Sequence, residues 1–289
     1  ITDMFKDATA MHNRFGNITN LGSFNDTPTL TFFNKTAITD DNKDTAVSGS
    51  ILDDITEYGH ISTWNTSAVT DMSNLFTNTS YISTFNEDIS RWDVSNVTNM
   101  SQMFYLAASF DQPLNDWDVS AVTDMSGLFQ GFQNSEDPSA NVNMVFNQPL
   151  NDWDVSSVTN MTAIFYMCTA FNQPLNNWNV SSVTSMVNMF AFTSVFNQPL
   201  NDWDVSKVTD MRNVFYYTLA FNQLLNNWDV SSVTDISRIF GKAAVFNRNI
   251  SNWDVSNVTD RYRSFWKSHM YHNSPNVHGD GDGYFTILN

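Results

Sequence analysis

The chain has 289 residues, of which 42% are hydrophobic and 14% aromatic, so it is long enough to bury a large core. Its formal net charge of -17 argues against a nucleic-acid partner, because binding a phosphate backbone needs clustered Lys and Arg. A single cysteine excludes a disulfide framework, and no run of about 18 apolar residues predicts a transmembrane helix.

Residues 1–56 predict a degenerate repeat followed by an irregular segment. Residues 4–11 repeat the Met, Phe and Ala spacing of 103–110, so we expect the chain to begin inside a repeat. Residues 31–57 contain five aspartates and do not fit any period. We expect them to fold as a cap over the end of a repeat array, or to form a long insertion.

Residues 57–272 are predicted to be a repeat array of eight units. The marker is Trp-Asp-Val-Ser or a close variant, with tryptophans at intervals of 28, 25, 36, 25, 25, 25 and 25 residues. They are Trp64, Trp92, Trp117, Trp153, Trp178, Trp203, Trp228 and Trp253. A fixed period predicts identical units that stack, each touching its neighbours, so we expect the indoles to form one continuous buried pile.

Each repeat is predicted to contain one short strand and one short helix. Leu150, Trp153 and Val155 have strand spacing, whereas the apolar positions of 158–165 recur at spacings of three and one, which is helical spacing. The Phe-Asn-Gln-Pro-Leu segment at 171–175 carries turn residues. The predicted fold class is therefore an α/β solenoid, with an all-β solenoid as the alternative.

The string Phe-Asn-Gln-Pro-Leu-Asn-Asn-Trp-Asn-Val-Ser-Ser-Val-Thr-Ser-Met at 171–186 has copies over about 57–266. It resembles the surface-lipoprotein repeat of mycoplasmas and lactic-acid bacteria, a domain of unknown function akin to BspA-like leucine-rich-repeat proteins. The resemblance implies a right-handed, leucine-rich-repeat-like solenoid on secreted or cell-surface proteins, used for adhesion or attachment. It supplies no catalytic residues.

Two units carry extra residues at one place, between the Phe twelve residues after Trp and the next Phe-Asn turn. The larger excess, eleven residues within 130–145, predicts a surface loop, and such loops commonly bind ligands. Tolerated drift is the alternative.

An aspartate follows Trp in six of the eight repeats, and Asn65 and Asn179 stand in the other two. The aspartates are Asp93, Asp118, Asp154, Asp204, Asp229 and Asp254. Stacked carboxylates repel one another, and Ca²⁺ between them would relieve the repulsion. The alternative, favoured by the two Asn replacements, is an Asx turn in which each side chain accepts a bond from the following Ser.

Thr stands six residues after every Trp, from Thr70 to Thr259. We interpret this column as helix N-caps, and a template for ordered water is the alternative. The aromatic residues next to the core Phe are predicted to be partly exposed and to contact a partner; they are Tyr105, Tyr166, Phe192, Tyr216 and Tyr217.

Residues 273–289 are predicted to be an acidic, Gly-rich tail or the start of a further domain. His278, Asp280 and Asp282 resemble the start of a calcium loop, but no acidic residue closes it. Ten Asn-x-Ser/Thr sequons occur, a count close to chance, and Asn34 and Asn78 are the best glycosylation candidates because they lie in predicted insertions.

The basic residues are unevenly placed. None occurs between Arg91 and Lys207, whereas 207–267 holds eight basic and five acidic residues and 1–91 holds five basic and twelve acidic ones. Opposite ends of opposite charge could dock head to tail and build a filament. A polar C-terminal cap that uses Arg261, Arg263, Lys267 and His269 is the preferred interpretation.

The acids repeat with the scaffold instead of forming a unique constellation, and no hydrolase, metalloprotease or phosphate-loop motif occurs. We therefore expect no catalysis and no cofactor, with Ca²⁺ as the one candidate ion. The predicted function is that of a non-enzymatic extracellular or cell-surface protein that presents a long face to a protein or glycan ligand. The alternative is a structural subunit of an extracellular fibre or sheath assembled from copies of itself.

Overall fold

The computed structural model describes residues 36–49, 58–77, 79–269, 277–279 and 285–287. By its contacts the chain divides into Ile1–Thr36 and Ala37–Asn289, and the second unit contains every element described below. These are helix α2 (Lys43–Gly49), the 3-10 helices η2 (Ile61–Thr63), η3 (Ile82–Thr84) and η4 (Pro138–Ala140), and strands β1 (Val277–Gly279) and β2 (Phe285–Ile287). Strands β1 and β2 pair antiparallel, with Val277 opposite Ile287.

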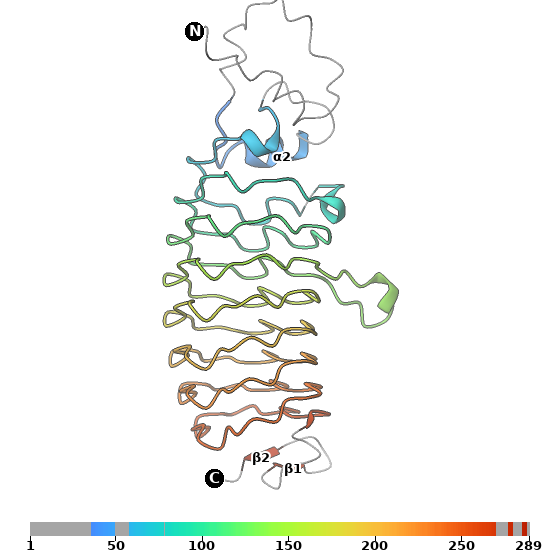
Figure 1. Cartoon of the computed structure of the whole chain (residues 1–289), viewed down its shortest axis with the longest axis vertical. Helices are drawn as coiled ribbons and strands as arrows, with labels where there is room; N and C mark the ends of the chain where they lie inside the picture. The colour runs from blue at the N-terminus through green and yellow to red at the C-terminus, as the bar shows by residue number, and fades with distance from the viewer. Residues whose placement is uncertain (1–35, 50–57, 78, 270–276, 280–284, 288–289) are drawn as a thin grey trace, which may run out of the picture. The chain divides into compact units, whose positions relative to one another are not determined.

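Successive repeats lie on top of one another as flat coils (Figure 1). Single parallel bridges join the residues seven positions after each Trp, for example Asp210 to Asp235 and Asp235 to Asp260. We number positions in a repeat by their distance from its Trp, so these residues occupy position +7. Each bridge holds one coil in register with the next.

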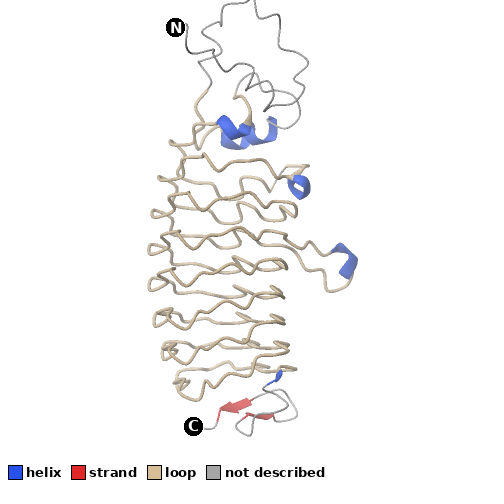
Figure 2. Cartoon of the chain, in the orientation of Figure 1, coloured by secondary structure: helices blue, strands red, loops and turns tan. Residues whose placement is uncertain are grey.

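The structure has turns where the sequence predicts a helix (Figure 2). Between 58 and 268 the described residues contain, besides turns, bends and irregular backbone, only the three 3-10 helices and single bridges. Position +10 has a positive φ in all eight repeats, for example 56° at Ala163, and position +14 has one in six, for example 62° at Met167. These left-handed residues are incompatible with a continuing right-handed helix.

The hydrogen bonds explain how turns imitate helical spacing. Ile164 N–H donates to the Met161 carbonyl three residues back at 3.4 Å, whereas Phe165 N–H donates to Met189 of the next repeat at 3.0 Å. A turn from 161 to 164 with a positive φ at its third residue has the φ signature of type II. Apolar residues spaced by three therefore face the core from a run of turns as well as from a helix.

The tryptophans are buried as the period predicts, and among the ring contacts of the described residues four of the seven adjacent pairs stack: Trp64–Trp92, Trp153–Trp178, Trp178–Trp203 and Trp228–Trp253. All eight indoles are 2–5% exposed, and Trp153 and Trp178 stack at 6.4 Å with an interplanar angle of 1°. From Trp92 onward each indole N–H donates, at 2.8–3.3 Å, to the carbonyl three residues before the preceding Trp. The tryptophan thus joins two repeats through both packing and a buried hydrogen bond.

Two columns of phenylalanine complete the core. The Phe rings at position +12 stack between adjacent repeats at 5.5–6.0 Å. Within each of the first seven repeats that ring lies 3.9–4.3 Å from the Phe that begins the following turn. The buried Cys168 belongs to the same interior: burial raises the pKa of its thiol, which donates to the Phe129 carbonyl at 3.0 Å.

Polar ladders hold the rims of the coils. Thr98 donates both its N–H and its hydroxyl to the carbonyl of Thr70, and the later threonines of this column repeat the pattern, so they link coils and do not cap helices. In the first repeat the carboxylate of Asp40 accepts the N–H and the hydroxyl of Thr70. It takes the place that the carbonyl of the preceding Thr has in the later repeats. Residues 37–49 therefore pack on the first repeat and complete its ladder.

We expect Trp203→Phe to destabilise the protein by about 2 kcal/mol, because it removes the buried indole bond to the Leu175 carbonyl, which keeps only the Trp178 N–H, and because the smaller ring leaves part of the indole's space empty. Urea unfolding followed by circular dichroism measures the change. Tyr217→Phe is the matched control, since it removes only a hydroxyl from an exposed ring, and it should stay within about 0.5 kcal/mol of the parent. Equal effects of the two substitutions would contradict the role of the indole N–H.

Candidate functional site

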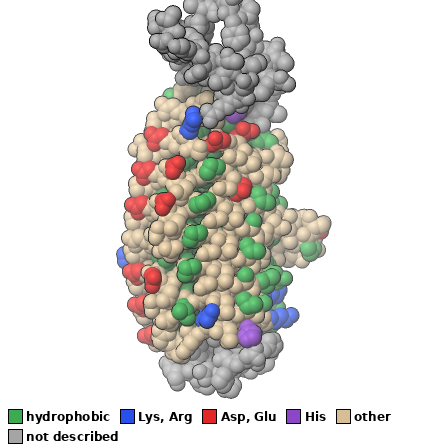
Figure 3. Space-filling model, in the orientation of Figure 1, with side chains coloured by type: hydrophobic (Ala, Val, Ile, Leu, Met, Phe, Trp, Pro, Cys, Tyr) green, Lys and Arg blue, Asp and Glu red, His purple; other side chains and the backbone are tan. Residues whose placement is uncertain are grey.

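The aspartate after each Trp forms an Asx turn, as the favoured interpretation predicts. In all six, Oδ1 accepts the N–H of the Ser two residues on, at 3.0–3.1 Å. Asn65 and Asn179 accept the same bond at 3.1 and 3.2 Å. The column is therefore part of the scaffold, and its acidic side chains are exposed along one edge of the coils (Figure 3).

Hydrogen bonds outweigh repulsion in this column. Ser120 lowers the pKa of Asp118 below the usual aspartate value, first through its hydroxyl and then through its N–H. The corresponding serines lower the pKa of Asp154, Asp204 and Asp229 in the same order, and Ser256 lowers that of Asp254 with its N–H first. Neighbouring carboxylates raise the pKa of Asp229, but this effect is the smallest.

The structure shows no site geometry for the predicted metal ligands and glycosylation residues. Among the described residues, no three His, Cys, Asp or Glu side chains lie together where they could hold a metal ion. Asp280, Asp282, Asn34 and Asn78 lie outside the described residues, and of His278 only its backbone pairing with Thr286 in β1 and β2 is described.

Four of the five predicted partner-binding aromatics lie side by side. Phe192 contacts Tyr166 at 5.6 Å, Tyr216 at 5.3 Å and Tyr217 at 5.3 Å between ring centroids. Tyr217 is 37% exposed and the other rings are half-buried, so the predicted partial exposure is confirmed. Tyr105 is half-buried as well, but it has no ring contact with the cluster among the contacts of the described residues.

These rings belong to a surface whose residues change from repeat to repeat. Positions +9, +10, +13 and +14 are exposed or half-buried in most repeats, and we call them together the variable face. Position +9, for example, holds Ser in four repeats and Thr, Val, Arg or Tyr in the others: Ser73, Ser101, Ser126, Thr162, Val187, Arg212, Ser237 and Tyr262. The buried and ladder positions change far less.

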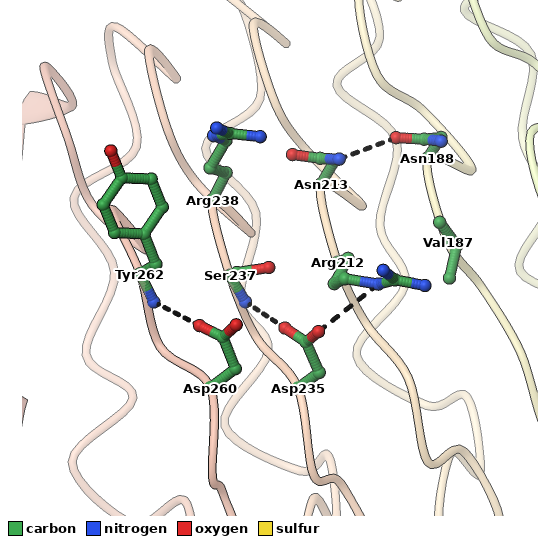
Figure 4. A pocket seen from close by; sticks show the side chains of 9 residues that line it. All are labelled: Val187, Asn188, Arg212, Asn213, Asp235, Ser237, Arg238, Asp260 and Tyr262. Carbon is green, nitrogen blue, oxygen red and sulfur yellow. Dashed lines mark hydrogen bonds and ion pairs between the residues drawn. The ribbon is translucent and has the colours of Figure 1, made fainter.

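Toward the C-terminal repeats the variable face borders an open groove of about 640 Å³ (Figure 4). Side chains from four consecutive coils line it: Val187, Asn188, Arg212, Asn213, Asp235, Ser237, Arg238, Asp260 and Tyr262. Arg212 pairs with Asp210 at 2.9 Å and with Asp235 at 3.3 Å. The groove thus offers guanidinium and amide donors beside carboxylate acceptors.

A network of cations and aromatic rings continues from this groove. The guanidinium carbon of Arg238 lies 5.4 Å from the Tyr262 ring, and that of Arg263 lies 4.9 Å from Tyr262 and 4.6 Å from Trp266. Lys242 lies 5.2–5.6 Å from Trp266, Tyr216 and Tyr217. Gly241 makes room for this arrangement, because a Cβ there would meet the Tyr216 ring at 3.0 Å.

Sequence reasoning missed the groove and assigned Arg263 and Lys267 to a polar cap. The signal that points to them is the change of residue type at +9, +10, +13 and +14 against constant neighbours. The inserted loop, by contrast, lies at the surface as predicted (Figure 1). It is closed by a bridge between Phe132 and Val142 and contains η4.

Comparison with known proteins places the repeats in a family. The family model described as "Mycoplasma protein of unknown function, DUF285" matches residues 49–144, 139–208 and 193–278. No curated protein and no solved structure matches the chain. In the part of the chain that the structure describes, no helix is long and apolar enough to cross a bilayer.

We expect the thermal midpoint to be steady from pH 7 to about pH 5 and to fall below about pH 4. The pKa values of Asp118, Asp204 and Asp229 are lower in the folded chain, so the unfolded chain takes up more protons as the solution becomes acidic. In Asp204→Asn/Asp229→Asn the Asx turns persist, as at Asn65, and the midpoint should fall less. If the thermal midpoints of the two proteins fell equally with pH, these aspartates would not be the cause of the acid sensitivity.

We also expect Asp204→Asn/Asp229→Asn to bind Ca²⁺ like the parent chain. One oxygen of each carboxylate already serves Ser206 or Ser231, so the column has no open set of ligands. Isothermal titration of both proteins with calcium chloride measures this. A calcium signal that disappears only in the variant would restore the column as an ion site.

Proposed function

The chain belongs to this Mycoplasma repeat family, and we propose that it is a non-enzymatic extracellular or cell-surface protein that binds a ligand through its variable face. We further propose that it shares the right-handed solenoid architecture of BspA-like leucine-rich-repeat proteins. The stacking of coils through parallel bridges supports the architecture, although turns replace the helix expected in each repeat.

The observation that carries the proposal is the contrast between constant and variable positions within one chain. Trp at 0, Thr at +6 and Phe at +12 recur in all eight repeats because each bonds or stacks with a neighbouring coil. The side chains at +9, +10, +13 and +14 face outward in most repeats and lie outside these stacks and ladders, while the backbone there bonds the next coil. A repeat scaffold with changing outward residues is suited to recognition.

The acidic groups support binding rather than catalysis. Each described aspartate with a shifted pKa has it lowered, so these carboxyls are ionised near neutral pH and are poor general acids. A catalytic pair needs two acids tuned apart. The aspartates of each column instead share one environment, so no two of them are tuned apart in this way.

A fibre subunit is the second candidate. The observation that favours it is the separation of charge: a long acidic stretch free of basic residues from 92 to 206 precedes the cation-rich repeats of 207–267. Copies of the chain could associate through these regions and extend into a filament.

The test is binding of the intact chain to an array of glycans and purified extracellular proteins. We expect at least one specific ligand, and we expect Phe192→Asn/Tyr217→Asn to weaken its binding by about tenfold or more through the loss of two aromatic contacts. Asn suits both positions because they have positive φ values of 62° and 60°.

Asp204→Asn/Asp229→Asn is the control, since it changes another edge of the coils and should bind normally. Absence of any ligand, or equal losses in both variants, would contradict binding through the variable face. Filaments of the pure protein in electron micrographs, together with an empty array, would favour the fibre subunit.

A further inference from the structure

The groove on the variable face combines three kinds of group within four coils. Arg238 supplies donors from position +10, and Asn213 supplies an amide there whose Nδ2 also donates to Asn188 at 2.9 Å. Tyr262 supplies an aromatic ring, and Asp260 supplies an acceptor from position +7 beside Asp235, which serves Ser237 and Arg212 (Figure 4). One oxygen of Asp260 accepts the N–H of Tyr262 at 2.9 Å, which leaves the second oxygen for another donor. Donors and acceptors side by side, next to an aromatic ring, are the groups that recognise sugar hydroxyls and a sugar face.

The cations of this region differ in whether they are neutralised. Arg212 is held by two aspartates, at 2.9 and 3.3 Å. The described residues place no carboxylate within ion-pair distance of Arg238, Lys242, Arg263 or Lys267, which lie against aromatic rings instead. In a chain of net charge -17 these four cations form a local positive surface beside the groove.

We propose that the groove binds an acidic saccharide, with its carboxylate or sulfate on Arg238, its sugar ring against Tyr262, and its hydroxyls on Asn213 and Asp260. The proposal rests on the proposed function and names the ligand chemistry of the same face. A guanidinium matches a planar carboxylate or a sulfate through parallel N–H donors. Arg263, Lys242 and Lys267 extend the positive surface for further acidic units of an oligomer.

The carboxylates of the groove decide between acidic partners. Asp235 and Asp260 line the groove at position +7, so a ligand that lies along it needs hydroxyl donors beside its anion. An acidic glycan has neutral hydroxyls between its charges, and those hydroxyls can donate to Asp260. A saccharide therefore fits the groove better than a nucleic acid does.

The test titrates the intact chain with three oligosaccharides: a hyaluronan octasaccharide for carboxylates, a heparin octasaccharide for sulfates, and cellohexaose as the neutral probe. We expect at least one acidic oligosaccharide to bind about tenfold or more tightly than cellohexaose, and its binding to weaken in 0.5 M salt, where the screening length falls to roughly 4 Å. The acidic probe that binds identifies the charged group.

Arg238→Gln should weaken that binding by about tenfold, which is the loss of one charge-assisted contact. The variant should fold normally, because Gln102 occupies the same position of an earlier repeat with a φ of 55°, close to the 53° of Arg238. Arg91→Gln is the matched control: it removes an exposed arginine outside the groove and should bind like the parent.

Three outcomes would overturn the site: no binding of either acidic probe, equal affinity for cellohexaose, or equal losses in Arg238→Gln and Arg91→Gln. If the array yields a ligand while both acidic probes fail, the saccharide site is wrong and binding through the variable face stands. If the array is empty as well, both proposals fail. Circular dichroism melts of the two variants confirm that any loss comes from the altered side chain.

Discussion

The structure depends on register between neighbouring coils, and the indole N–H sets it. Each tryptophan from Trp92 onward packs against the preceding repeat and donates to a carbonyl of that repeat, in a core where an unpaired indole N–H would be costly. A slip of one residue would break this bond and the phenylalanine stacks together. The repeats therefore stack in one arrangement, and the same residue types recur at the same positions.

Register also determines what the polar residues do. The side chains of Asn147, Asn172, Asn197 and Asn222 each accept the N–H of the corresponding residue in the next coil, and the Thr column bonds in the same direction. The aspartates beside Trp serve their own turns. The repeated Asn, Thr and Asp side chains could be mistaken for binding sites, but most of their hydrogen-bonding groups are already used within and between the coils. Recognition is left to side chains that the core stacks and the Thr and Asn ladders do not use.

Left-handed residues shape the surface on which recognition is proposed. Position +10 carries Asn, Gln, Gly, Ala or Arg with a positive φ, and the inter-repeat bonds of its N–H hold it there, as for Ala163 and Val187 at 2.7 Å. Arg238 and Arg263 project from this strained position beside Tyr262. The positive-φ residues that prevent a helix in each repeat are thus the residues that carry these cations.

The sequence by itself determined the period, the buried stack of indoles, the Asx turns and the surface position of the inserted loop. These follow from spacing and from contacts within a few residues or between equivalent positions. Only the tertiary structure decided between helix and turns, because apolar residues spaced by three face the core in both, and φ at Ala163 depends on bonds to the next coil. Only it placed Asn188, Arg238 and Tyr262 around one groove, since residues about 25 apart meet only after the coils stack in register.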